Sequence, residues 1–525
     1  MSGPASKDAQ PSLDAGPASN RIGRGQWMAL TAALLGWMFD GAEMGVFSII
    51  GRPALKELLR DGSGSAPPED ILNVWFAIIM AGFLVGAATG GVLFGWLGDR
   101  IGRVRAMTLS VITYAVFTGC CGLVGSAWQM GVLRFLAALG MGGEWSLGVA
   151  LVMEVWPNRS RAFMAGLIGA AGNFGYLLVG IIGLGLESIL ADLAQWFRAA
   201  GLAEATVVWL TDPPGWRILM LLGATPALLT FLIRLFVPES ERWLHQKATG
   251  AVSHWATRDL LGVLVGALGP AMIIYLWAWP FSIPVRLAGS IAGLLLATAG
   301  YTYPVIRFLQ RQSKDSHEHA LAYAWRPTLR RMLLAAGLSG VALLGTWGAA
   351  QWAPAWADKL AGSQAKYYTQ IWMACGAVLG TLLAAMMGDW LGRKRAYALL
   401  CVAAMISLLV LYRGNTEYGN GFLASAFAVG VCTASFYGWL PLYLPELFRT
   451  KVRATGQGFG FNFGRILAAI GTLQTGSLFA ERIHIGGWDL EGGYPLACSA
   501  MSMIYLVGLV LICFAPETRG RPLPD

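Results

Sequence analysis

The sequence predicts an all-α polytopic membrane protein, with two six-helix bundles, an inserted two-helix hairpin and about 14 transmembrane helices. Of the 525 residues, 56% are hydrophobic and only 13% are charged, whereas about a quarter of the residues in soluble domains are charged. Apolar runs of about 20 residues, the length that crosses a bilayer, recur along the chain. This pattern excludes a soluble globular enzyme, and short matches between the two halves indicate a duplication.

The expected spans form two sets of six. The first set lies at about 27–50, 71–97, 106–125, 128–154, 162–190 and 216–237, and the second at about 330–354, 367–391, 396–413, 421–445, 454–480 and 493–515. They define an N-terminal bundle, 26–244, and a C-terminal bundle, 330–518. Residues 1–25 are rich in Ser, Ala, Gly and Pro, which predicts a disordered tail, and residues 519–525 form a second tail.

The central insert, 245–329, carries two further apolar runs at about 260–279 and 287–306, followed by a loop. Both runs are long enough to span a bilayer. An even number of added spans leaves the orientation of the second bundle unchanged. We therefore expect an extra transmembrane hairpin, with a re-entrant hairpin or a surface pair as the alternative.

Basic residues indicate the orientation of the chain. They follow the second span of each set, as Arg100, Arg103 and Arg105 and then as Arg393, Lys394 and Arg395. Loops rich in Lys and Arg stay in the cytoplasm, so we expect both termini there and the protein in the inner membrane. The net charge of +9 then reflects orientation and not a nucleic-acid partner. The expected partners are lipids, protons and a small-molecule substrate, for a monomer without metal or cofactor.

The duplication is clearest in one loop. Residues 98–106, Gly-Asp-Arg-Ile-Gly-Arg-Val-Arg-Ala, match residues 388–396 at six of nine positions. Glu154 and Arg161 match Glu446 and Arg453. Pro-Glu-Ser at 238–240 likewise matches Pro-Glu-Thr at 516–518. Repeats of this kind are typical of secondary transporters, in which two bundles rock about a site near the membrane midplane.

The loop from Gly95 to Arg105 resembles the loop signature of the major facilitator superfamily. Its glycines permit a tight turn, and Asp99 is placed to meet a helix N-terminus or an arginine when the cytoplasmic side closes. The resemblance implies alternating access with this loop as a gate. The expected gate residues are Gly95, Gly98, Asp99, Arg100, Gly102, Arg103, Asp389, Gly392 and Arg393, with Glu154, Arg161, Glu446 and Arg453 at neighbouring helix ends.

Further motifs are similar to those of organic-acid and sugar symporters. Asp-Gly-Ala-Glu at 40–43 is similar to a pattern of aromatic-acid:proton symporters, and the layout of about 14 spans resembles that of bacterial sialic acid transporters. The resemblance implies proton-coupled uptake of a small organic anion such as a sialic or aromatic acid. A sugar or neutral-solute symporter or facilitator, an anion exchanger, and a transporter-like receptor are the alternatives.

Ionisable residues inside spans cost at least about 2.5 kcal/mol each, so they are functional candidates. Asp40 and Glu43 share one helix face. Glu43 and Arg134 lie at matching depths, about 10 Å and about 9 Å below the outer boundary at the rise of a helix. We expect Glu43 and Arg134 to couple transport to protons, with Asp40 as a further proton site. A permanent structural ion pair is the alternative. Glu144 either lines the cavity or holds a neighbouring helix.

Arg465 lies about 18 Å into its helix, near the membrane midplane. Its counterpart in the first set is Asn173, so symmetry does not require a charge there. An unpaired guanidinium with Asn462 one turn earlier is suited to bidentate capture of a carboxylate. Pairing of Arg465 with Asp40 is the alternative. The expected substrate-binding residues are Arg465, Asn462, Asn173, Tyr437 and Trp347.

Overall fold

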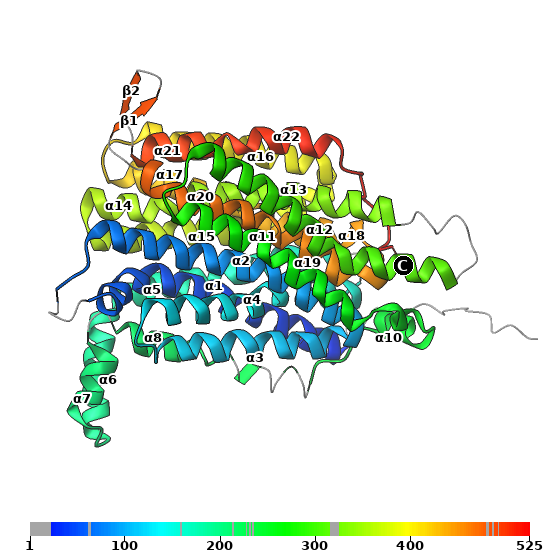
Figure 1. Cartoon of the computed structure of the whole chain (residues 1–525), viewed down its shortest axis with the longest axis horizontal. Helices are drawn as coiled ribbons and strands as arrows, with labels where there is room; N and C mark the ends of the chain where they lie inside the picture. Colours follow the sequence, from blue (N-terminus) through cyan, green and yellow to red (C-terminus); the bar gives the residue numbers. More distant parts are fainter. Residues whose placement is uncertain are drawn as a thin grey trace, which may run out of the picture.

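A computed structural model describes residues 23–524, except 61–64, 158–159, 213–214, 227, 230–232, 234–235, 316–324, 479–481, 486–487 and 492. The expected tail at 1–25 and the loop after the central hairpin thus lie largely outside the described residues. The long helices run side by side along one direction (Figure 1). Within the described residues, twelve helices are long and apolar enough to cross a membrane.

The first bundle consists of α1 (Arg24–Leu58), α2 (Glu69–Ile101), α3 (Arg103–Cys121), α4 (Ala127–Val155), α5 (Arg161–Leu184) and α8 (Trp216–Leu222). The second consists of α13 (Trp325–Gly348), α15 (Ser363–Leu391), α16 (Arg393–Gly414), α17 (Asn420–Ala434), α18 (Phe436–Leu447), α19 (Arg453–Asn462), α20 (Gly464–Leu478), α21 (Tyr494–Ser502) and α22 (Ile504–Cys513). In this second bundle the pairs α17–α18, α19–α20 and α21–α22 each take the place of one span.

Two of the expected spans are not among the twelve. The span at 216–237 is described only in part. The span at 454–480 consists of α19 followed by α20. The helix is interrupted between them at Phe463, and the span carries polar side chains such as Gln457 and Arg465. The other expected spans each coincide with a membrane-length helix or helix pair.

The two ends of the molecule differ. The repeated loops around Gly102 and Gly392 lie at one end, here called the motif end, with α10 (Glu241–Ala248) and the C-terminus. At the opposite end lie α14 (Ala353–Ala361), a hairpin of strands β1 (Arg482–Ile485) and β2 (Trp488–Glu491), and helices α6 (Leu186–Ala199) and α7 (Glu204–Thr211). In the antiparallel hairpin, Arg482 lies opposite Glu491. Helices α6 and α7 project sideways from the bundle, across the direction of the long helices (Figure 1).

The insert forms a hairpin of α11 (Leu260–Ala278) and α12 (Ile283–Asp315), both of membrane-spanning length. The two helices approach closely at glycines, because a Cβ on Gly300 would collide with the backbone of Gly266. The hairpin packs against α2 of the first bundle and α20 of the second. Tyr301 and Thr89 join it to α2 through a buried hydroxyl contact of 2.7 Å. The hairpin therefore covers a seam between the bundles along its length.

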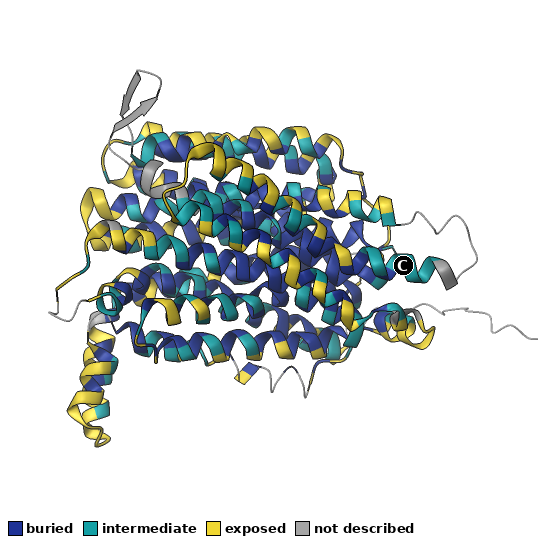
Figure 2. Ribbon diagram, in the orientation of Figure 1, coloured by how far each residue is buried: buried dark blue, intermediate teal, exposed yellow. Residues whose placement is uncertain are grey.

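Buried residues concentrate in the interior, and exposed residues cover the outer helices (Figure 2). Much of that exposed surface is apolar, as at Leu264 and Leu295 of the hairpin, which are 64% and 66% exposed. Apolar surface of this extent is suited to lipid and not to water.

Candidate functional site

A cavity of about 140 Å³ lies between the two bundles. The first bundle contributes residues of α1 and α5, and the second contributes residues of α13, α15, α17, α18, α19 and α20. Its walls are mainly apolar and aromatic, with Trp37, Tyr176, Trp347, Tyr437 and Phe461 among them. An apolar cavity of about 150 Å³ accommodates a benzene ring, so this one has room for a ligand of about one ring.

Arg465 supplies the positive charge of the cavity wall. Its side chain is buried, and its Nε and Nη1 atoms have no hydrogen-bond partner in the described chain. It stands directly after the interruption between α19 and α20. Among the described residues, neither Asp40 nor any other carboxylate forms an ion pair with it, and Asp40 acts on it only through space. The guanidinium is thus available to an anion.

Three other predicted binding residues line the cavity, namely Asn173, Trp347 and Tyr437. The Asn173 side-chain amide donates to the Gly169 carbonyl at 2.9 Å. The Tyr437 hydroxyl donates to Thr346 Oγ1 at 3.0 Å, which fixes the ring at the wall.

Asn462 was also expected at the cavity, but the structure places it elsewhere. Its Nδ2 donates to the Gly142 carbonyl at 3.0 Å and to the Gly458 carbonyl at 3.1 Å. It therefore joins α19 to α4 of the other bundle and does not line the cavity.

Several cavity residues escaped the sequence analysis. On α1, the lining residues Trp37, Gly41, Met44 and Ser48 recur at the spacing of one helical stripe. Phe461 precedes Arg465 by one turn, and its ring lies 5.7 Å from the guanidinium carbon. Spacing from Arg465 is a signal for Phe461, but nothing in a single sequence says which stripe of α1 faces inward.

Glu43 and Arg134 form a buried ion pair between α1 and α4. Thr118 of α3 donates to the same Glu43 oxygen at 3.0 Å. The rings of Phe47 and Phe83 lie 4.3 Å and 4.6 Å from the Arg134 guanidinium carbon, so the cation is held by aromatic faces as well. The matching depths correctly indicated this contact. Neither partner lines the cavity, so the pair and the cavity are separate sites.

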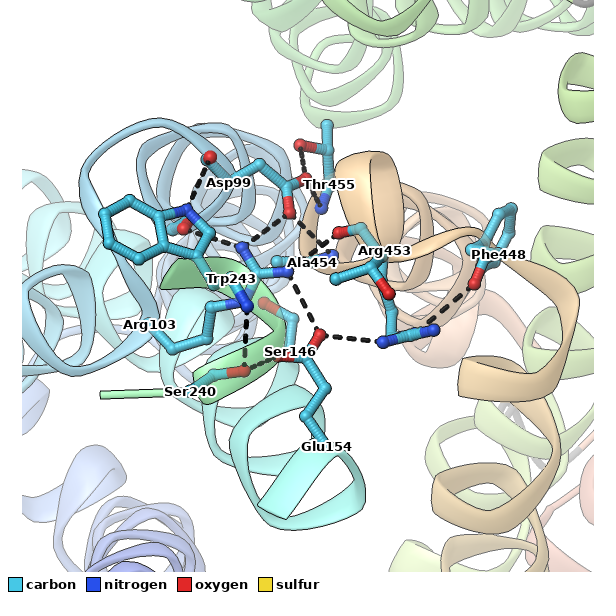
Figure 3. A network of polar contacts seen from close by, with 12 residues as sticks. Asp99, Arg103, Ser146, Glu154, Ser240, Trp243, Phe448, Arg453, Ala454 and Thr455 are labelled. Carbon is cyan, nitrogen blue, oxygen red and sulfur yellow. Dashed lines mark hydrogen bonds and ion pairs between the residues drawn. The ribbon is translucent and has the colours of Figure 1, made fainter. Parts of the chain in front are cut away.

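At the motif end, Asp99 links the first bundle to the second (Figure 3). Its carboxylate accepts from the backbone of Thr455 at 2.9 Å, from the Thr455 hydroxyl at 2.6 Å and from the backbone of Ala454 at 3.3 Å. It also pairs with Arg103 at 2.9 Å. Asp99 thus contacts both the N-terminus of α19 and an arginine, an arrangement that stabilises a carboxylate.

Glu154 makes a second link across the bundles (Figure 3). Its Oε1 lies 3.1 Å from Arg103 and 2.8 Å from Arg453 of α19. Ser240 donates to its other oxygen at 2.5 Å. Arg453 also donates to the Pro524 carbonyl at 2.6 Å, which holds the C-terminal residues at this network. The motif end is therefore closed in this structure.

Among the described residues, the ion pairs of the second copy of the loop lie inside its own bundle. Arg393 lies 2.7 Å from Glu446, and Thr518 donates to Glu446 at 2.5 Å. Asp389, by contrast, is 58% exposed and pairs with Arg393 at 3.2 Å. Arg161, at the start of α5, acts on Glu446 through charge. The two copies of the loop are thus alike in sequence but not in what they join.

The remaining gate residues lie around the first loop. Arg100 donates to Thr257 at 2.7 Å. Arg103 donates to the Gly98 carbonyl at 2.8 Å. A Cβ on Gly95 would collide with the backbone of α19, so this glycine permits the close approach that Asp99 requires.

The profile of the sugar (and other) transporter family matches residues 27–255 and 282–524. The chain belongs to this family. The cis,cis-muconate transport protein of Acinetobacter baylyi is 25% identical, over 93% of this chain and 96% of its own length. The niacin transporter of the same organism is 24% identical, over 96% of each chain. A solved structure of the major facilitator proton:xylose symporter has 19% identity and a TM-score of 0.65, covering 95% of this chain and 98% of its own.

The fold is accordingly that of a major facilitator transporter, a multi-pass membrane protein and not an enzyme. The matched ranges leave out residues 256–281, which contain α11. The first helix of the hairpin thus lies outside the matched ranges.

Two carboxylates cap the helices that follow the repeated loops, a role that sequence analysis missed. Glu239 accepts from the Arg103 backbone at 2.9 Å, and Glu517 accepts from the Arg393 backbone at 3.0 Å. Burial raises the pKa of Glu239 above its ordinary value. The backbone amides that donate to it and the charge of Arg103 lower the pKa, but burial outweighs them. For Glu517, burial also acts upward, but backbone amides outweigh it and the pKa lies below its ordinary value. The matched Pro-Glu-Ser and Pro-Glu-Thr segments were the available signal.

We expect Gly102→Ala to destabilise this transporter by about 1–3 kcal/mol. Gly102 has a φ of 112°, which favours glycine, and a Cβ there would collide with the Glu239 carboxylate. The expected result is a lower midpoint of thermal unfolding in detergent. The neutral control is Gly414→Ala at the end of α16, where a Cβ would make only an ordinary van der Waals contact with Val410. Equal midpoints for wild type and Gly102→Ala would refute this account of the loop.

Proposed function

We propose that the protein is a proton-coupled symporter of a bacterial inner membrane that imports a small organic anion by alternating access. One observation carries the proposal: the unpartnered, buried guanidinium of Arg465 in the wall of the cavity between the bundles. A buried, unpaired charge is costly. A substrate carboxylate offsets that cost through two parallel hydrogen bonds.

The cavity favours a monocyclic acid over a sialic acid. Its lining offers aromatic faces, at Trp37, Tyr437 and Phe461, and exposes little polar surface to satisfy the hydroxyls of a sugar. Its volume is about that of a site for one ring. Two relatives bear the names of cis,cis-muconate and niacin, both small carboxylates, and niacin has a single aromatic ring. We therefore expect an aromatic or unsaturated carboxylate.

Glu43 and Arg134 are the proposed coupling pair. Burial favours the neutral form of a carboxyl group, and a nearby cation favours the charged form, so a change in their separation exchanges a proton. The pair lies between α1 and α4, and α1 also lines the cavity. Movement of α1 around a bound anion would therefore reach the pair directly. The solved structure compared above is that of a proton:xylose symporter.

The motif end is proposed to face the cytoplasm. Its loops carry the clustered basic residues, as cytoplasmic loops do. Both described chain ends lie there, since Gln26 contacts the Val155 carbonyl and Pro524 contacts Arg453. The contacts of Asp99 and Glu154 with α19 then close the cytoplasmic side, and release of substrate into the cell requires them to break.

A binding panel tests the proposed substrate class. Purified protein in detergent is titrated calorimetrically with nicotinate, benzoate and cis,cis-muconate, with their neutral analogue nicotinamide, and with xylose and sialic acid. We expect at least one small carboxylate to bind about 100-fold more tightly than nicotinamide, as for a lost charged hydrogen-bond pair. Preferential binding of xylose, or equal binding of nicotinate and nicotinamide, would overturn the proposal.

The cytoplasmic gate gives a paired prediction. We expect Asp99→Asn to open the motif end and Asp389→Asn to leave it closed, because only Asp99 reaches across to α19. Spin labels on Arg105→Cys and Arg395→Cys, in a background without native cysteines, report the distance between the bundles. Longer distances in Asp99→Asn alone are the predicted result, and an equal shift in both variants would contradict the assigned asymmetry.

A further inference from the structure

A second group of acidic residues lies inside the first bundle, apart from the Glu43 and Arg134 pair. Asp40 of α1 is 0% exposed and Glu144 of α4 is 2% exposed. The buried hydroxyl of Tyr114, from α3, completes the group. None of the three lines the cavity at Arg465. Glu144 reaches α1 because Gly36 has no side chain, and a Cβ there would occupy the space of the carboxylate.

The two carboxyl groups lie on adjacent helices, and neither is bonded to a cation of the described chain. The Glu144 carboxyl passes Gly36 of α1, about one helical turn before Asp40, so the two acidic groups lie near each other and act on each other electrostatically. No polar group of the described chain hydrogen-bonds to their oxygens or to the Tyr114 hydroxyl. Two carboxylates do not accept hydrogen bonds from each other, and both cannot stay ionised in contact. A buried pair of acidic groups is stabilised when one proton is held between them.

The charges around the cluster connect it to the substrate cavity. Glu43 of the same helix acts on Asp40 with a repulsive charge, and Glu43 itself is neutralised by Arg134. The cation that acts on Asp40 is Arg465, across the interface between the bundles. Arg465 thus stabilises the deprotonated form of the cluster, and it is the same side chain that would bind an anion.

We propose that Asp40 and Glu144 form a second proton-binding site, which holds one shared proton and takes it up when an anion binds at Arg465. The inference rests on the proposed function. The bound anion neutralises Arg465, so the negative charge on the Asp40 and Glu144 pair loses its compensating cation. The pair then binds a proton. Linkage is reciprocal, so protonation of the pair also strengthens anion binding. Anion and proton therefore load together without touching each other.

The surroundings suit a proton rather than a metal ion. The described residues contain no cluster of three or more His, Cys, Asp or Glu side chains that could hold a metal. A small cavity of about 10 Å³ adjoins Glu144, with room for about one water molecule. Trp145 also lines this small cavity, and its indole nitrogen has no hydrogen-bond partner in the described chain. Trp37 lines both this cavity and the larger one, so its side chain borders the proposed proton site as well as the substrate site.

The test counts protons taken up per anion bound, in detergent and without transport. The probe is the tightest carboxylate of the panel, titrated in buffers of different ionisation enthalpy. We expect wild type and Glu43→Gln both to take up protons at the cluster. Uptake should be lost in Asp40→Asn/Glu144→Gln, a variant that keeps both side chains hydrogen-bonding but removes their charge. Anion affinity in wild type should fall as pH rises, by about tenfold or more as a typical coupling, and the double variant should be flat.

Each outcome decides a different claim. If no carboxylate binds the wild type, the proposed function fails, and the inference fails with it. If the anion binds and the double variant takes up as many protons as wild type, the second site alone is refuted. The same holds if binding follows the sodium concentration and not pH. Because the double variant can fold poorly, infrared spectra of wild type and Asp40→Asn give an independent measurement. The protonated-carboxyl band gained on anion binding should be absent from Asp40→Asn, and an unchanged band would also refute the site.

Discussion

Arg465→Gln is expected to weaken binding of a small aromatic carboxylate by about 100-fold or more, since two charged hydrogen bonds contribute about 3 kcal/mol together. Gln fills a similar volume without the charge or the fork of donors. The unpaired guanidinium is costly in the empty protein, so the variant should fold at least as stably as wild type. Calorimetric titration measures the affinity, and thermal unfolding measures the stability.

Two further variants separate charge from geometry. Arg465→Lys keeps the charge and loses the bidentate geometry, so its affinity should lie between wild type and Arg465→Gln. Arg413→Gln removes an exposed arginine that donates to Ser499, away from the cavity, and should bind as wild type does. Wild-type affinity in Arg465→Gln would show that the anion site lies elsewhere.

Glu43→Gln is expected to abolish accumulation of the anion against its gradient while exchange across the membrane continues. Gln still accepts hydrogen bonds from Arg134 and Thr118, but it cannot bind or release a proton. Proteoliposomes with an imposed pH gradient measure accumulation, and labelled anion on both sides measures exchange.

Glu57→Gln is the matched control for this variant. Glu57 also pairs with an arginine, Arg217, at 2.7 Å, and accepts from the Trp216 indole at 2.6 Å, but it is half-exposed. Its removal should leave accumulation unchanged. Equal accumulation by Glu43→Gln and wild type would assign the buried pair a purely structural role.

The fold was largely predictable from the sequence because each span is long and apolar, and because loop charge and internal repeats mark where spans end. The prediction was least accurate where polar residues interrupt the apolar pattern. Expected span 454–480 is broken at Phe463, and Arg465, which lines the cavity, follows two residues after the break. The expected span 162–190 included the first residues of α6. The rest of α6 and all of α7 fell between two expected spans, because these two helices lie outside the bundle.

Depth was predictable in the candidate site, but rotation was not. The rise per residue placed Glu43 and Arg134 at one level, and the structure brings them into contact. The same arithmetic placed Asn462 one turn from Arg465, yet Asn462 faces α4 while Arg465 faces the cavity. Which way a membrane helix turns depends on the packing of its neighbours, and a single sequence does not encode that in any local pattern.

The repeated loops illustrate the same limit. Gly95 and Ala385 occupy matching positions, and the two residues make different contacts. Gly95 lets α2 approach α19, whereas the methyl group of Ala385 lies against Gly166 of α5. The repeat places Asp99 and Asp389 at equivalent gate positions. The structure shows one crossing by Asp99 and an exposed Asp389 instead.

Simultaneous measurement of proton and anion entry tests the central claim most directly. Liposomes containing the protein and an internal pH dye receive the carboxylate that binds most tightly, and protein-free liposomes correct for passive entry of the protonated acid. Our account predicts an internal acidification that accompanies anion uptake, that is absent for nicotinamide and that is lost in Glu43→Gln. Anion uptake at the wild-type rate without acidification would contradict proton symport and leave exchange or facilitated diffusion as the activity.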